Sequence, residues 1–287
     1  MSRFSPSDAA LEGFRLSRTH PGMLLAWSAV YFGGLLLIFL VMTATLGPEF
    51  IAVARKDGFF SGDLDDISEL LAHSLPAFLL VLGLSALLWS IMTAGVLRLV
   101  LRPSEHGFAH LKVGRDELRL TLANLLCVGI YVATAIVGIV LYQAARQSGP
   151  IATAVVVLGA LAFVFWVGVR LSLLLPTVFQ TGKISLADAW GRTKGHYWPL
   201  LGMLLLAAIC YVMVWVVFAV ISVILVAVSG GGDALQDMTH LNVVTALSAV
   251  LTLIMQFLLQ VLQIVMIYAP TAVAYREITG EADPEAF

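Results

Sequence analysis

Six long apolar runs constrain the fold of this chain more than any other feature of its sequence. The spans they predict lie at residues 23–46, 75–97, 120–143, 151–169 with an apolar extension to 179, 199–229 and 243–275. A helix rises about 1.5 Å per residue and the hydrocarbon core of a bilayer is about 30 Å thick, so about 20 residues suffice to cross it. Because hydrocarbon offers the backbone no hydrogen-bond partner, each run is expected to be helical.

The composition excludes a soluble protein with buried helices. Hydrophobic residues make up 60% of the 287 residues and charged residues 12%, which leaves too little polar surface for a soluble chain of this length. We therefore predict an all-α integral membrane protein with a single six-helix domain at 23–275. Residues 1–22 are expected to form an interfacial helix on the cytoplasmic side, and residues 276–287 a cytoplasmic tail.

The basic residues predict the orientation of the chain. All 16 Lys and Arg residues except Arg55, Lys56 and Arg146 lie at the N-terminus, around the second or fourth loop, or in the tail. Because cytoplasmic loops carry an excess of Lys and Arg, both termini are expected in the cytoplasm. The overall charge of -2 and the lack of a dense basic run give no indication of a nucleic-acid partner.

Similar segments recur at corresponding places along the chain. Residues 13–25 and 189–201 each place an aromatic residue, a basic residue four positions on, a histidine six positions on and then two leucines before an odd-numbered span. At the ends of the even-numbered spans, residues 92–98 (MTAGVLR) align with residues 270–276 (PTAVAYR), and Pro176-Thr177 takes the same place in span four. This pattern predicts three helical hairpins descended from one unit. Chance similarity between apolar helices is the alternative.

The segments before spans one, three and five are predicted to be short amphipathic helices in the cytoplasmic interface. Ser5 with Asp8, and Ser185 with Asp188, have the spacing of helix N-termini. In the segment before span five, five residues are expected to lie at the lipid headgroups: Trp190, Tyr197 and Trp198 as an aromatic belt, and Arg192 and Lys194 as contacts to lipid phosphates. The alternative is that these side chains set the topology and contact no particular lipid.

One stretch of the sequence resembles a known group of proteins. Residues 170–202 (RLSLLLPTVFQTGKISLADAWGRTKGHYWPLLG) carry the similarity through Arg170, Pro176, Trp190, Lys194, Gly195 and Trp198. The pattern resembles bacterial six-span inner-membrane proteins related to the membrane portion of glycerophosphoryl diester phosphodiesterases. Because this chain shows no soluble barrel domain for phosphodiester chemistry, the resemblance implies a fold and an inner-membrane location, and no activity.

Arg170 is the charged residue that the sequence places deepest in a span. No Asp, Glu, Lys or His lies between the ends of a predicted span, so the proton relay of many pumps is not expected. About nine largely apolar residues follow Arg170, which puts it about 10 Å inside the hydrocarbon boundary if the helix is straight. Snorkelling to the headgroups, pairing with backbone carbonyls near the proline, and gripping a lipid phosphate or anionic ligand are the alternatives.

Span six contains a second polar feature, a stripe of three glutamines. Gln256, Gln260 and Gln263 have i, i+4, i+7 spacing and share one helical face. Since amides facing lipid would lack partners, the stripe is expected to point into the bundle. It would then form interhelical hydrogen bonds or line a polar cavity. Its possible partners are Ser85, Ser90, Thr93 and Asn124.

The sequence contains no recognisable catalytic constellation, and it predicts no cofactor or metal. The function it favours is therefore that of a non-enzymatic accessory or scaffold component contacting lipids or a protein partner. A transporter or lipid-handling protein that uses Arg170 and the glutamine stripe is the alternative. An intramembrane enzyme would need a nucleophile or an acid–base pair within the spans.

The charge asymmetry predicts the outcome of a topology experiment. Reporter fusions after Ser61, Ser148 and Gly231 should report the periplasm, because few basic residues flank those positions. Fusions after Glu105, Gly182 and Phe287 should report the cytoplasm. Each fusion is assayed with one reporter that is active in the periplasm and one that is active in the cytoplasm. A cytoplasmic signal from the Gly231 fusion would contradict the six-span arrangement.

Overall fold

The computed structural model describes residues 5–47, 64–105, 109–228 and 243–280, and every regular element within these ranges is a helix. The helices are α1 (Pro6–Thr19), α2 (Pro21–Thr45), α4 (Leu64–Leu101), α5 (Arg115–Arg146), α6 (Pro150–Leu171), α7 (Leu174–Thr181), α8 (Leu186–Arg192), α9 (Tyr197–Val228) and α11 (Val243–Thr279). Six helical segments are long and apolar enough to cross a membrane. The prediction of an all-α membrane protein with six spans is confirmed.

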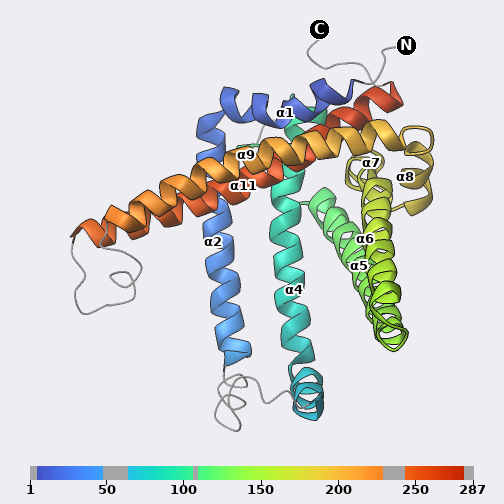
Figure 1. The fold of residues 1–287 in the computed structure, drawn as a ribbon. Helices are drawn as coiled ribbons and strands as arrows, with labels where there is room; N and C mark the ends of the chain where they lie inside the picture. Colours follow the sequence, from blue (N-terminus) through green and yellow to red (C-terminus); the bar gives the residue numbers. More distant parts are fainter. Residues whose placement is uncertain (1–4, 48–63, 106–108, 229–242, 281–287) are drawn as a thin grey trace.

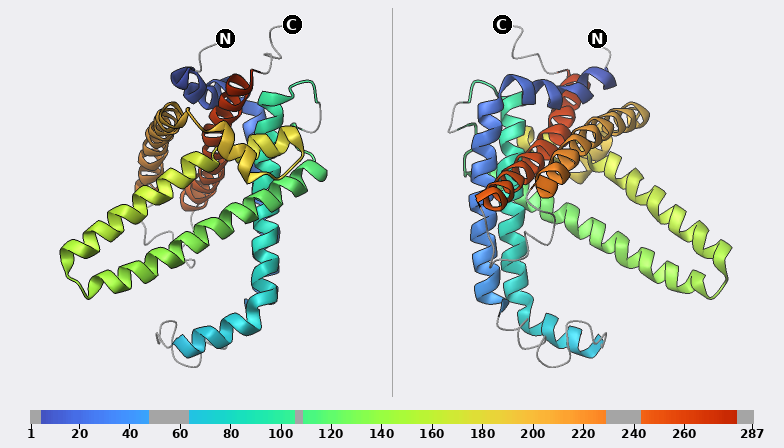
Figure 2. Two further views of the ribbon diagram at one scale, coloured as in Figure 1. Left: turned by 90° about the vertical axis from the view of Figure 1, so that its right-hand side faces the viewer. Right: turned by 60° about the vertical axis from the view of Figure 1, so that its left-hand side comes forward.

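Three helical hairpins diverge from a common base (Figure 1). The arms are α2/α4, α5/α6 and α9/α11, and the two further views show that they point in different directions (Figure 2). We call the base, where the ends of α4, α7 and α11 meet, the hub. The two ends of the described chain are joined beside it, because the backbone N–H of Ser5 donates to Glu277 Oε2 at 3.1 Å.

The arms are longer than a bilayer core is thick. The helices α5 and α9 have 32 residues each, so each is about 48 Å long. Such a helix fits within about 30 Å of hydrocarbon only when it is strongly tilted, and divergence from the hub supplies a tilt. The most apolar stretches of α5 and α9 contain no buried residue. The outer parts of these arms therefore present apolar side chains to lipid.

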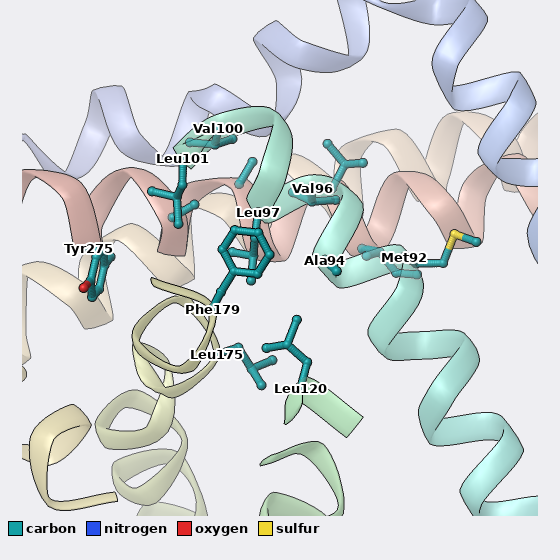
Figure 3. Packing of buried hydrophobic residues seen from close by; sticks show 14 of the residues in the cluster. Met92, Ala94, Val96, Leu97, Val100, Leu101, Leu120, Leu175, Phe179 and Tyr275 are labelled. Atoms are coloured by element: carbon teal, nitrogen blue, oxygen red, sulfur yellow. The ribbon is translucent and has the colours of Figure 1, made fainter. Parts of the chain in front are cut away.

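The hub contains the buried core of the protein. Figure 3 shows buried side chains from α4, α5, α7 and α11 converging there, among them Leu97, Leu120, Leu175, Phe179 and Tyr275. Each of these side chains is at most 6% exposed. Since lipid offers no hydrophobic drive for helices to associate, close packing at the hub is what holds the arms together.

The three hairpins place equivalent threonines in the hub. Thr93, Thr177 and Thr271, which align in the predicted repeat, are 0%, 0% and 2% exposed. Each hydroxyl donates to a carbonyl one turn earlier in its own helix, at distances of 2.9, 2.7 and 2.8 Å. The sequence correspondence between the hairpins is therefore matched by a correspondence in position.

Span four is broken near its hub end. The apolar extension predicted to residue 179 is helical, but the chain divides it into α6 and α7 at Ser172 and Leu173. Pro176 lacks the N–H that would bond to the carbonyl of Ser172, and its ring clashes with that carbonyl in a continuous helix. The break redirects α7 into the hub, where Pro176 is buried.

The short helices predicted before spans one and five are present as α1 and α8. In α8, Ser185 Oγ accepts from the backbone N–H of Asp188 at 3.2 Å, as the capping pattern predicts. The prediction of a third such helix before span three is wrong, because residues 102–105 and 109–114 form turns and extended chain. There Ala109 and His110 have positive φ angles of 49° and 60°.

Two buried side chains hold this connection in its non-helical shape. Trp27 Nε1 donates to the carbonyl of Ala109 at 2.7 Å, and Arg98 Nη1 donates to the carbonyl of His110. A right-handed helix requires negative φ at both positions, so the bonded geometry excludes it. The positive φ values are retained because neighbouring structure fixes both carbonyls.

Helix α1 packs across α9 and α11 through small residues. Ala9, Ala10 and Gly13 are buried, whereas Leu11 and Phe14 are 47% and 51% exposed. A Cβ on Gly13 would lie 2.7 Å from the Cα of Met266 in α11. A glycine is therefore needed where the two backbones cross.

Replacing Gly13 with alanine should loosen the attachment of α1. The added methyl group would force the two backbones apart, at an expected cost of about 1–3 kcal/mol. A lower Tm of the detergent-solubilised protein would measure this. Gly22→Ala is the matched control, because nothing lies within 4 Å of its Cβ position. An equal Tm for the two variants would contradict the crossing geometry.

Candidate functional site

The guanidinium of Arg170 lies among three aromatic rings. Its central carbon is 5.9 Å from the ring centroid of Trp166, 5.4 Å from that of Trp190 and 5.9 Å from that of Tyr197. Trp166 belongs to the same helix, whereas α8 folds back against α6 to supply Trp190, and α9 begins with Tyr197. The break after α6 and the turn before α9 thus bring the rings around one cation.

The hydrogen-bond donors of Arg170 are mostly unused. Nη1 donates to Thr193 Oγ1 at 3.2 Å, and Nε is buried without a hydrogen-bond partner. Among the described residues, no carboxylate lies within 4 Å of this guanidinium. The side chain therefore bonds to a threonine hydroxyl instead of to the backbone carbonyls near Pro176. Nδ1 of His196, three residues after Thr193, is also buried and unpaired.

The other residues predicted at the headgroups have different surroundings. Trp198 is 76% exposed and meets Tyr197 edge to face, with ring centroids 5.4 Å apart. Lys194 is exposed. Arg192 places its guanidinium 5.0 Å from the centre of the Tyr275 ring, so it connects α8 to α11. Of the five residues, Trp190 and Tyr197 are the two that the fold brings to Arg170.

The glutamine stripe divides into two parts. Gln260 Nε2 donates to Gln263 Oε1 at 3.2 Å, and the Tyr211 hydroxyl donates to the same oxygen at 3.4 Å, which joins α9 to α11. Gln256 is exposed and lines a groove between α9 and α11 beside Trp215. The prediction that the whole stripe points into the bundle is therefore wrong for Gln256, because α9 and α11 lie side by side here but leave an open groove between them.

The polar residues proposed as partners of the stripe bond elsewhere. Asn124 Nδ2 donates to Ser90 Oγ at 2.8 Å and so joins α5 to α4. Ser85 and Thr93 each donate to a carbonyl of their own helix. No direct bond connects these four residues to the glutamines in the described part of the chain.

A buried ion pair beside the hub was missed by the sequence analysis, which assigned Arg98 to topology alone. Arg98 Nη2 donates to Glu117 Oε1, and both side chains are 2% exposed. Arg98 Nε also lies 3.3 Å from Glu105 Oε2. The sequence did contain a signal for this pair. Arg98 follows the apolar run at 75–97, and Glu117 lies just before the next run at 120–143.

Arg102 extends this cluster to α7. Its Nη2 donates to the carbonyl of Phe179 at 3.0 Å and its Nε to Gln180 Oε1 at 3.1 Å. The guanidinium lies 4.6 Å from the centre of the Phe179 ring. The end of α4 is thereby bonded to both α5 and α7.

Comparisons with protein-family models, curated proteins and solved structures found no match to this chain. The fold defines a polytopic all-α membrane protein. The resemblance of residues 170–202 to the membrane portion of glycerophosphoryl diester phosphodiesterases stays a prediction.

Removing one member of the buried ion pair should destabilise the protein strongly. Arg98→Leu leaves the Glu117 carboxylate buried without its partner, with an expected loss of about 3–5 kcal/mol. The double variant Arg98→Leu/Glu117→Leu should recover part of that loss. Thermal unfolding in detergent measures both effects.

The control for this experiment is Lys112→Ala. Lys112 pairs with Glu105 at 3.7 Å, and the two side chains are 43% and 38% exposed, so its removal should change the Tm little. A single Arg98 variant as stable as the Lys112 variant would show that the buried pair does not hold α4 to α5.

Proposed function

We propose that this protein is a non-enzymatic scaffold or accessory component of the bacterial inner membrane that binds an anionic lipid headgroup at Arg170. The observation that supports this most directly is the unmet hydrogen-bonding capacity of Arg170. Its guanidinium is charged and half-buried, yet it has one hydrogen bond and no carboxylate partner among the described residues.

The three rings around Arg170 hold the cation without neutralising it. A cation over an aromatic face gains about 0.5–2 kcal/mol, which does not offset the removal of an unpaired charge from water. A guanidinium has five N–H donors in a planar fork. Two oxygens of a phosphate match that fork through parallel hydrogen bonds. A lipid phosphate would satisfy both the charge and the donors.

The surroundings of Arg170 fit a position near lipid headgroups. Trp198 and Lys194 are exposed beside the start of α9, and aromatic and basic side chains favour the membrane interface. The predicted orientation places this end of the protein at the cytoplasmic leaflet, whose anionic lipids attract basic residues. The ligand we propose is therefore an anionic phospholipid of that leaflet.

The packing of the hub favours a scaffold over a transporter. Close-packed apolar side chains fill the region where the arms meet, whereas transport requires a polar path with two alternating openings. Gln256 borders a groove of about 270 Å³. This groove lies on the surface between α9 and α11, outside the hub. The exposed apolar faces of the arms offer partner proteins a large contact surface within the bilayer.

Arg170→Lys should reduce the binding of anionic lipid. Lysine keeps the charge but cannot form two parallel hydrogen bonds with one phosphate, and losing one charge-assisted bond corresponds to about tenfold weaker binding. Native mass spectrometry of the protein released from nanodiscs containing phosphatidylglycerol and phosphatidylcholine would measure the bound fraction of each lipid.

The control is Arg146→Lys, which alters an arginine lying over a ring at the far end of α5. The Arg146 guanidinium is 5.8 Å from the centre of the Tyr142 ring, so the two substitutions are chemically matched. We expect phosphatidylglycerol occupancy to fall for the Arg170 variant alone. Equal phosphatidylglycerol occupancy in both variants and the unaltered protein would contradict lipid binding at Arg170. Arg170 would then only anchor span four at the membrane interface.

A further inference from the structure

A lateral cleft separates the bases of two arms, and it is distinct from the Arg170 site. The helices α5 and α6 form one wall, and α9 and α11 form the other. Its volume of about 640 Å³ lies within the range of small-molecule pockets, about 300–1,000 Å³. Most of the lining is apolar, including Val128, Phe165, Leu204 and Leu205. Because all four helices are membrane spans, the molecules that reach the cleft directly are lipids.

Two polar side chains on one face of α5 line this cleft with unused hydrogen-bonding groups. Asn124 uses its amide nitrogen to bond Ser90, while its carbonyl oxygen has no partner among the described residues. The Tyr131 hydroxyl also has none there. The two residues are separated by seven positions, or about 10.5 Å along the helix, and so face the cleft at two depths.

The other hydroxyl groups in the lining are already engaged. Ser172 donates to the carbonyl of Val169 at 2.8 Å, and Thr271 donates to the carbonyl of Tyr268. The Tyr268 hydroxyl accepts from Trp89 Nε1 at 3.0 Å. The unmet capacity of the cleft is therefore confined to α5. An amide oxygen without a donor is unfavourable in hydrocarbon, and a ligand with a hydroxyl group would satisfy it.

The position of Asn124 along α5 indicates the depth at which that hydroxyl group would lie. Arg119 is charged, 44% exposed and paired with Asp116 at 3.6 Å, so it marks the polar end of the span. Asn124 follows five residues later, about 7.5 Å further along the helix. This places its amide just inside the hydrocarbon boundary, where the glycerol backbone of a lipid meets its acyl chains.

The charge of the lining distinguishes between classes of lipid. None of the residues lining the cleft is charged. A phosphorylated headgroup would bring a negative charge to a wall that has no cation to pair with it. We propose that the cleft binds one uncharged lipid with a free hydroxyl group, of the diacylglycerol class. Its hydroxyl donates to Asn124 Oδ1 and its acyl chains lie along the cleft past Tyr131.

The test compares two lipids that share the same acyl chains. The full-length protein is placed in phosphatidylcholine nanodiscs containing equal amounts of dioleoylglycerol and dioleoylphosphatidic acid, and native mass spectrometry measures which lipid remains bound. We expect dioleoylglycerol to be retained preferentially. Asn124→Leu should lower its occupancy about fivefold, the effect of one neutral hydrogen bond.

A second pair of variants keeps the test decisive if Asn124→Leu, which also loses the bond to Ser90, folds poorly. Ala208 lies exposed in the cleft wall, whereas Ala162 is exposed on α6 outside the cleft. Ala208→Trp should fill the cleft and abolish dioleoylglycerol retention, and Ala162→Trp should leave it unchanged. Equal retention of the two lipids, or undiminished dioleoylglycerol binding by the Ala208 variant, would overturn the proposal. Neither outcome bears on phosphatidylglycerol binding at Arg170.

Discussion

The buried ion pair between Arg98 and Glu117 is the interaction on which the arrangement of the arms depends. A charge in this apolar environment must be paired, so the end of α4 and the start of α5 are held at one fixed position. Arg98 also bonds the carbonyl of His110, which fixes the connection between these two helices. The arms can therefore diverge into lipid, because their junction is specified by polar contacts that lipid cannot replace.

Divergence explains why the candidate sites lie at the bases of the arms. Along the outer parts of α5 and α9, lipid covers the side chains on all sides not facing the hairpin partner. Near the hub the arms approach each other. Breaks in the helices there change the direction of the chain and bring polar side chains and aromatic rings together. The helix break at Leu173 and the turn before Tyr197 create the surroundings of Arg170 in this way. The lipid-facing cleft beside Asn124 has the same origin, since two arms meet there without closing.

Arg170 shows how far the sequence alone could identify a site. An arginine followed by apolar residues is unusual enough to be noticed in a single sequence, and Trp190 was separately assigned to the lipid headgroups. Their meeting depends on α8 folding back against α6, which no local pattern specifies. Arg98 was interpreted as a topology signal because its partner is 19 positions away, across a connection whose shape is set by Trp27.

The sequence by itself indicated that the helices lie in a lipid bilayer. It also indicated the number of spans, their pairing into hairpins and the equivalent threonines of the hub. These properties follow from hydropathy and from short repeated motifs, which act locally along the chain. Only the tertiary structure decided the angles between the arms, the exposure of Gln256 and the non-helical connection before α5. The physical reason is that these spans are apolar around their whole circumference, so hydropathy does not distinguish a face toward lipid from a face toward protein. Long-range packing and the few buried polar contacts make that choice.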